Sequence, residues 1–154
     1  NPTPLDGTQS ISVWVFSTEG AGSNYIRTMV GRSATGNGSN TLSLHPNNQK
    51  FAFYEADGNA VVVSQAAITA STWYHLVVTF DGTATVLYQN GLSHDTGTLD
   101  LADPFNNNSN LTIGGGYANR YFAGRIGEIL LFSKTLSATE VRSIYEQSRW
   151  RYNI

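Results

Sequence analysis

The feature that most constrains the fold is a series of short runs in which apolar and polar residues alternate, each run ending at turn residues. Alternation with a period of two places the apolar side chains on one face of a β-strand. The clearest run is Tyr74–Phe80, and similar β-branched or aromatic runs occupy residues 11–16, 42–44, 51–53, 61–63, 86–88, 111–113 and 126–132. So many short strands in one domain predict an all-β sandwich or barrel.

Turn residues at the ends of these runs predict antiparallel neighbours. Asp81-Gly82 and Asn90-Gly91 each follow a predicted strand. Both pairs supply the positive-φ positions that tight hairpins need. We therefore expect the strands on either side of each pair to lie next to one another.

One helix is predicted near the C-terminus. Ser137 and Glu140 have the spacing of a capping box, in which each side chain accepts a hydrogen bond from the other residue's backbone N–H. Apolar residues then recur at helical spacing, at Val141, Ile144 and Tyr145. We expect this helix to end near Ser148 and the tail beyond it, with Trp150, Tyr152 and Ile154 in alternation, to be extended.

Composition narrows the range of partners. Charged residues are 13% of the chain, whereas Asn, Ser and Thr together make 45 of its 154 residues. A surface solvated by amides and hydroxyls suits hydrogen-bonding ligands such as sugars. Nine basic against eleven acidic residues argue against nucleic acid, which needs a basic face.

The longest apolar run, Ile129–Phe132, is too short for membrane insertion. With no cysteine to form disulfides, we expect residues 1–154 to fold as a single domain on apolar packing alone.

The order of the motifs resembles the laminin-G-like domains of the concanavalin A-like lectin/glucanase superfamily. The resemblance rests on Ser10–Phe16 with its central Trp14, Trp73-x-His75 leading to Phe80-Asp81-Gly82, Val86–Gly91, Leu111–Gly115, Phe122–Phe132 and Leu136–Val141. It implies an antiparallel jelly-roll β-sandwich with one short C-terminal helix. It also implies a non-catalytic extracellular recognition module that binds glycans or protein partners through loops at the sandwich edge.

Two departures from this family stand out, and the second leads to an alternative function. The acidic pair that the family usually carries is replaced by Gly127-Glu128, and only Asn1–Gln9 precedes the first motif, where the family has another strand. A neighbouring strand would then have an open edge. We expect the tail Trp150–Ile154, or a segment of another chain, to cover it. The alternative is thus a structural subunit of a virion surface or an extracellular filament, a homo-oligomer joined through the N-terminal edge and this tail by strand or tail complementation.

The sequence does not favour an enzyme. Glycosidases need two carboxylates flanking the scissile bond, and no predicted strand carries two acidic residues two positions apart. Glu128 is the only acidic residue inside a predicted core strand, and we interpret it as structural. His75 is interpreted as a packing residue that donates to the backbone.

Two clusters combine tyrosine rings, which stack on sugar C–H groups, with polar groups that bind sugar hydroxyls. The first lies in a glycine-flanked loop and comprises Tyr117, Asn119, Arg120 and Tyr121. The second comprises Tyr54, Asp57 and Asn59. We predict ligand binding at these residues.

Calcium is the one ion that the loops could hold. Ca²⁺ binds six to eight oxygen atoms of carboxylates, amides and carbonyls. Some relatives in the family that the chain resembles carry a calcium ion at the sandwich rim. The residues here that could supply such oxygen atoms are Asp95, Asp100, Asp103 and Asn106. We expect no required cofactor, a structural Ca²⁺ as an option, and an extracellular, cell-surface or virion-surface location.

Overall fold

A computed structural model describes residues 10–19, 27–32, 41–44, 49–54, 59–98, 111–115 and 121–154. The elements in these ranges are β1 (Ser10–Ser17), β2 (Arg27–Arg32), β3 (Thr41–Leu44), β4 (Phe51–Tyr54), β5 (Ala60–Val63), β6 (Trp73–Phe80), β7 (Ala84–Gln89), β8 (Leu92–Thr98), β9 (Leu111–Ile113), β10 (Gly124–Phe132), α1 (Ala138–Ser148) and the 3-10 helix η1 (Arg149–Tyr152).

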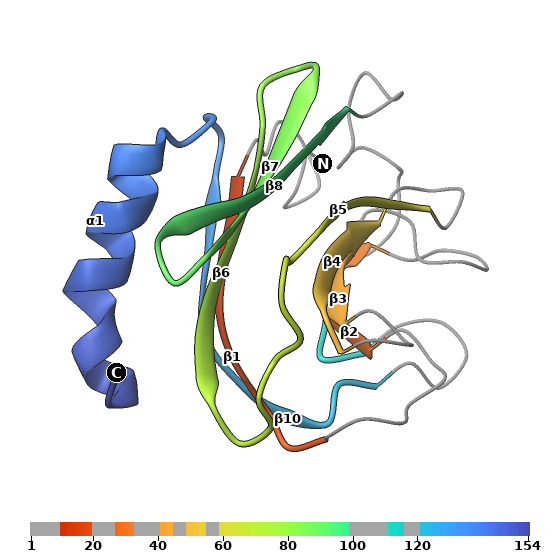
Figure 1. Ribbon diagram of the computed structural model, residues 1–154, viewed down its shortest axis with the longest axis vertical. Coiled ribbons are helices and arrows are strands. Elements are labelled where there is room, and N and C mark those ends of the chain that lie inside the picture. Colours follow the sequence, from red (N-terminus) through yellow and green to blue (C-terminus); the bar gives the residue numbers. More distant parts are fainter. Residues whose placement is uncertain are drawn as a thin grey trace.

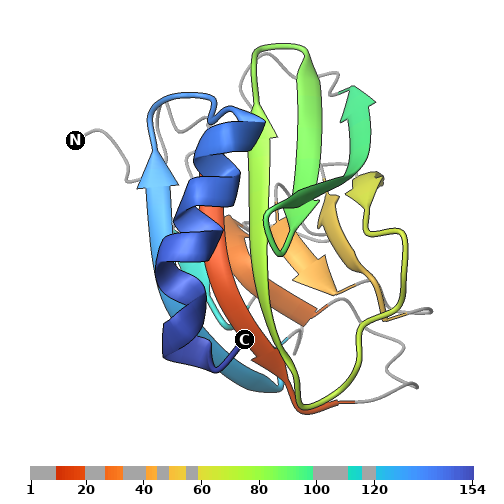
Figure 2. The ribbon, with the colours of Figure 1, turned by 60° about the vertical axis from the view of Figure 1, so that its left-hand side comes forward.

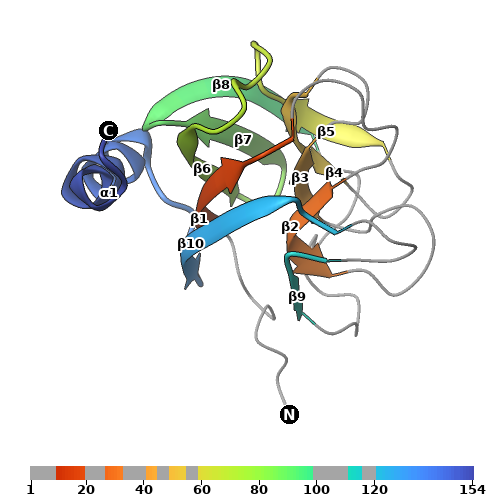
Figure 3. The same cartoon turned by 90° about the horizontal axis from the view of Figure 1, so that it is seen from below.

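The strands form two five-stranded sheets that lie face to face (Figure 1). Sheet A has the order β10-β1-β6-β7-β8, and sheet B has the order β5-β4-β3-β2-β9. Neighbouring strands are antiparallel throughout both sheets. Seen from below, β8 and β5 meet on one side of the sandwich and β10 and β9 lie on the other (Figure 3). The predicted antiparallel jelly-roll sandwich is therefore confirmed.

The main core lies between the two sheets. On the sheet A side it contains Ile11, Val13 and Val15 of β1 and Leu76, Val78 and Phe80 of β6. On the sheet B side it contains Met29, Val30, Phe51, Phe53 and Val62. Fully burying a side chain of this kind stabilises the fold by roughly 1.5–3 kcal/mol. The alternating runs of the sequence thus predict the inward face of each of these sheet A strands correctly.

The two predicted turns adopt the expected backbone. Asn90 and Gly91 have φ values of 52° and 77°, and Gly82 has a φ of 102°. The Asn90 side chain also accepts a hydrogen bond from the His75 N–H at 3.0 Å, and the Asn90 N–H donates to the His75 carbonyl at 2.8 Å. The β6–β7–β8 meander is thereby held in register at its Asn90 end.

Strands β2 and β8 are not predicted by the sequence pattern. In β2 the neighbouring residues Met29 and Val30 are both buried, because the pairing of β2 with β3 shifts register between Thr28 and Val30. This irregularity breaks the period of two. Strand β8 has no buried residue and carries mainly polar side chains, because it is the edge strand of sheet A.

Helix α1 covers the outer face of sheet A (Figure 2). Ser137 and Glu140 form the predicted capping box, and α1 ends at Ser148 as expected. Its residue Val141 and the preceding Leu136 pack with Val77 and Tyr88 of the sheet in a second apolar cluster. In the described part of the chain, no helix is long and apolar enough to cross a membrane.

His75 is buried between sheet A and α1, where none of its surface is exposed. Its Nε2 atom lies 2.8 Å from the Ser12 hydroxyl, and its ring packs 5.0 Å from Trp14 and 5.9 Å from Tyr145 between centroids. The expected packing role holds, but the hydrogen-bond partner of the ring is a side chain rather than the backbone. Burial lowers the pKa of His75 from 6.5 to about 4 because it penalises the charged form.

The C-terminal tail is not extended, so that prediction is wrong. It forms η1, and the Tyr152 ring stacks on Trp14 with the centroids 4.2 Å apart. The Tyr152 hydroxyl accepts a hydrogen bond from the Glu128 N–H at 2.9 Å, next to a register shift in the β1–β10 pairing. A Cβ atom at Gly127 would lie 2.5 Å from the same hydroxyl, so glycine is the residue that fits. The tail thus packs on the face of sheet A and adds no strand to an edge.

Candidate functional site

Tyr54 and Tyr121, the tyrosines of the two predicted sugar-binding clusters that the structure describes, lie at opposite ends of sheet B. Tyr54 is paired with Thr41 and Ala60 at one end of the sheet. Tyr121 bridges to Thr28 near the start of β2, at the other end. These two residues are therefore considered separately.

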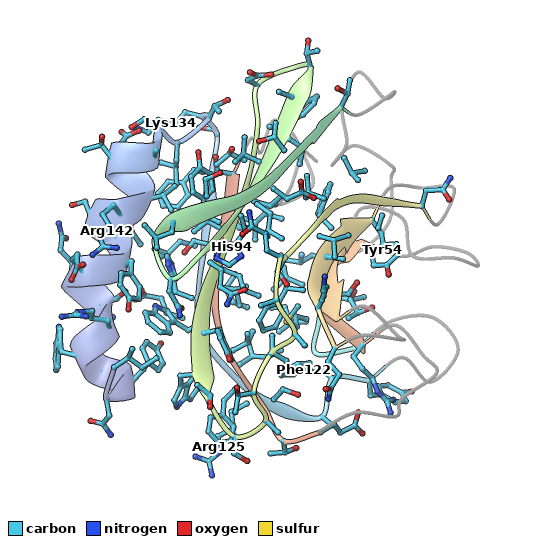
Figure 4. All side chains as sticks on the ribbon, viewed as in Figure 1. Tyr54, His94, Phe122, Arg125, Lys134 and Arg142 are labelled. Carbon is cyan, nitrogen blue, oxygen red and sulfur yellow. The ribbon has the colours of Figure 1, made fainter. Side chains whose placement is uncertain are left out.

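In the predicted cluster of Tyr54, Asp57 and Asn59, Tyr54 is 4% exposed and Asn59 is exposed. Figure 4 shows Tyr54 on sheet B. Asp57 lies outside the described residues. The Tyr54 ring therefore has little surface for a ligand to contact, and binding at this cluster stays a prediction.

At the other end, the Tyr121 ring is 61% exposed. A bend at Gly114, whose φ is 69°, positions it. The Gly114 N–H donates to the Met29 carbonyl at 2.8 Å, and the Phe122 N–H donates to the Gly114 carbonyl at 3.0 Å. A Cβ atom at Gly115 would lie 3.2 Å from the Tyr121 ring, so the ring lies close over this glycine. Phe122, labelled in Figure 4, packs against the main core and anchors the segment.

An arginine–glutamate pair lies at the same end of β2. The Nε and Nη2 atoms of Arg27 donate to the two carboxylate oxygens of Glu19 at 3.0 and 3.1 Å. This two-point geometry neutralises both charges and holds the end of β1 to the start of β2. We call Tyr121, Arg27 and Glu19 the rim site. The other members of the predicted loop cluster, Tyr117, Asn119 and Arg120, lie outside the described residues.

Asp95, the one predicted calcium ligand in a described segment, has a structural role. Its Oδ2 atom accepts a hydrogen bond from the Val63 N–H at 2.7 Å, and its Oδ1 atom accepts one from the Thr96 N–H at 2.9 Å. The bond from Val63 links the edge strands of the two sheets, β8 and β5. The Gln65 side chain strengthens the link by donating to the His94 carbonyl at 2.9 Å.

Among the residues that the structure describes, no three His, Cys, Asp or Glu side chains gather into a metal site. Asp100, Asp103 and Asn106 lie outside those residues. The described part of the predicted ligand set is Asp95 alone, and each of its carboxylate oxygens accepts one backbone hydrogen bond. Calcium binding stays a prediction.

Each acidic residue of the described segments is held by a cation or by backbone N–H groups. Asp81 accepts from the N–H groups of its own turn, and Glu128 pairs with Arg151 at 2.8 Å. The remaining ones are Glu19 with Arg27, Asp95 with Val63 and Thr96, Glu140 with Lys134, and Glu146 with Arg142 and Arg149. Glu128 is thus structural in this fold, as its isolation in the sequence indicates.

Comparison with known proteins places the chain in a family. Residues 1–142 match a laminin-G-type family model described as the concanavalin A-like lectin/glucanases superfamily. The chain therefore belongs to this superfamily. A search of the curated proteins finds no match.

Solved structures with the same fold include carbohydrate-binding modules. A Bacteroides ovatus protein provisionally described as carbohydrate-binding has a TM-score of 0.71 and 16% identity over 88% of this chain, which spans 40% of that protein. The CBM40 module of a Ruminococcus gnavus sialidase has a TM-score of 0.68 and 18% identity, over 90% of this chain and 82% of the module, and it has also been solved with α2,3-sialyllactose. Domain 4 of an extracellular arabinanase from Geobacillus stearothermophilus, solved with arabinotriose, has a TM-score of 0.61 and 20% identity, over 90% of this chain and 66% of that one.

Proposed function

We propose that this chain is a non-catalytic module that binds glycans at the rim site. The observation that carries the proposal is the Tyr121 ring, which is 61% exposed yet fixed in place by a glycine bend and a core anchor. A rigid aromatic ring presents an apolar face at little entropic cost, which suits stacking on a sugar. The Arg27–Glu19 pair supplies oriented polar atoms at the same end of the sheet.

Two further observations support binding without catalysis. The acidic residues of the described segments are already engaged by cations or backbone groups, so they are poorly placed as a catalytic pair. The chain also shares its fold with a sialidase CBM40 module solved with sialyllactose and with an arabinanase domain solved with arabinotriose. We further propose an extracellular location, because that arabinanase is an extracellular enzyme.

The test is titration of the protein with arabinotriose and with α2,3-sialyllactose, followed by a glycan array with and without a calcium chelator. For any glycan that the array identifies, Tyr121→Ala should weaken the binding at least tenfold. The matched control is Trp150→Ala, which removes another exposed aromatic ring, 69% exposed, from the far side of sheet A. Equal binding by both variants, or no binding to any glycan in either condition, would refute the rim site.

A second candidate function is self-assembly through the edge of sheet A. In the described part of the chain, β10 has no strand on its outer side. Its residues Ile129, Leu130 and Leu131 are only half-buried. Exposed edges of this kind accept strands from other chains. Sedimentation should then show oligomers that a Leu130→Lys substitution converts to monomers, whereas a monomeric wild-type protein at all concentrations would reject this candidate.

A further inference from the structure

Three neighbouring strands of sheet A carry a row of side chains on the sheet's outer face. In the strand register, Phe16 of β1 lies opposite Arg125 of β10 on one side and opposite Trp73 of β6 on the other. The Phe16 and Trp73 rings are 5.5 Å apart between centroids, and the Arg125 guanidinium lies 5.2 Å from the centroid of the Phe16 ring. Tyr152 borders the row, with its ring 4.6 Å from Trp73. We call Arg125, Phe16, Trp73 and Tyr152 the aromatic row.

The aromatic row lies beyond the part of the sheet that α1 seals. Trp14, two residues before Phe16, is only 1% exposed because Tyr145 and Tyr152 stack over it. Phe16, Trp73 and Tyr152 are half-buried, and Arg125 is exposed. The row is therefore the accessible end of a stack of aromatic rings, and the other end of the stack, at Trp14, is buried. Figure 4 shows Arg125 at the bottom end of the sandwich, away from Tyr54.

The charge of Arg125 distinguishes this row from ordinary packing. Four arginines of the described segments, Arg27, Arg142, Arg149 and Arg151, form ion pairs with glutamates. Arg125 has no carboxylate partner among the described residues. The nearby Glu128 is already paired with Arg151. A guanidinium that stacks on a ring keeps N–H groups at its edge, and their fork geometry matches a carboxylate.

We infer that the aromatic row is a second binding surface, separate from the rim site, for a saccharide unit that carries a carboxylate. The face of Trp73 contacts the C–H groups of a sugar ring, and Arg125, which lies over the Phe16 ring, binds the carboxylate. Thr18 follows β1 directly, and the Ser71 N–H donates to the Ser17 carbonyl at 2.7 Å, so both exposed residues lie close to the end of β1 that carries Phe16, and their hydroxyl groups suit sugar hydroxyls.

The size of the row favours a saccharide over a protein partner. A stable protein interface buries about 800 Å² on each partner. Three half-buried rings and one arginine expose too little surface for such an interface, but enough for one or two sugar rings. Three of the four members, Phe16, Trp73 and Arg125, lie on paired strands, and Tyr152 lies in η1.

The experiment compares two disaccharides that differ only in the carboxylate, cellobiuronic acid and cellobiose, by titration followed in ¹H–¹⁵N spectra. Cellobiuronic acid should shift the amide signals of Phe16 and Arg125 and the indole signal of Trp73, and cellobiose should bind at least tenfold more weakly. Arg125→Gln should remove this preference, and Arg125→Lys should restore it only partly because lysine lacks the fork. The control Lys50→Gln removes one positive charge elsewhere and should leave the preference intact.

The outcomes separate this inference from the rim site. Shifts at the aromatic row without shifts at Gly115 and Tyr121 would support the second surface even if the rim site failed. Absence of shifts at the row, equal binding of the two disaccharides, or an unchanged preference in a folded Arg125→Gln protein would each overturn the inference. If the row binds a protein partner instead of a saccharide, neither disaccharide should shift the signals of the row.

Discussion

Lowering the pH should destabilise the protein through one buried residue, His75. Its folded-state pKa of about 4 lies below the ordinary value of 6.5, so between these values the unfolded chain binds more protons than the folded one. Stability from this residue is complete above pH 6.5 and falls as the pH drops to about 4. The pKa difference of about 2.5 corresponds, at roughly 1.4 kcal/mol per pKa unit, to about 3 kcal/mol.

The surroundings of His75 explain why no neighbouring group offsets the cost of protonating its buried ring. The Nδ1 atom of His75 has no hydrogen-bond partner, and Nε2 contacts the neutral Ser12 hydroxyl. On the helix, Arg142 and Arg149 lie over the Tyr145 ring that stacks on the imidazole, and both are paired with Glu146. A protonated His75 would therefore have no carboxylate as a hydrogen-bond partner among the described residues to offset its burial.

Urea unfolding measured from pH 7.5 to pH 4, with tryptophan fluorescence as the signal, tests this reasoning. His75→Gln is the matched variant, because glutamine can bond Ser12 but does not titrate. The unfolding free energy of the wild type minus that of the variant should fall by about 3 kcal/mol as the pH drops from 6.5 to 4, because only the wild type carries His75. Carboxylates and His94 titrate in both proteins and cancel in the difference. Parallel pH profiles for the two proteins would refute the assignment.

Three substitutions test other contacts. Gly97→Ala would place a Cβ atom against the Val61 carbonyl where β8 meets β5, and should lower the unfolding free energy by about 3 kcal/mol in urea; a stability within error of the wild type would contradict the close contact. Tyr152→Phe removes the acceptor of the Glu128 N–H, so a loss of about 1–2 kcal/mol is expected, together with faster hydrogen exchange at that amide. Ser137→Ala removes the N-cap of α1 and should cost about 1 kcal/mol, measured by thermal unfolding, whereas an unchanged melting temperature would show that tertiary packing alone sets the helix start.

The candidate sites differ in how far the sequence predicts them. The sequence points to Tyr121 because it lies in a loop that follows consecutive glycines, a setting that can present an aromatic ring. Tyr54 fits the same reasoning but is buried, because its alternating run places it within a strand of sheet B. For the aromatic row, the alternation shows that Phe16 and Trp73 face away from the core. Only strand register could show that they lie side by side with Arg125.

What the sequence by itself determines is local. Alternation sets the inward face of strands such as β6, positive-φ residues such as Gly82 set turns, and Ser137 with Glu140 sets the start of α1. These features depend on residues within a few positions of one another, so their energetics can be recognised along the chain.

Tertiary structure alone decides what depends on residues far apart in the chain. The residues of the tail alternate like those of a strand, yet Tyr152 stacks on Trp14 and accepts a hydrogen bond from the Glu128 N–H. A short exposed strand would make neither contact. Strand β8 carries mainly polar side chains, and the bond from the Val63 N–H to Asp95 holds it to sheet B. In both cases the deciding partners are far apart in the sequence, 24 residues for Tyr152 and Glu128 and 32 residues for Val63 and Asp95, so no local pattern encodes the contact.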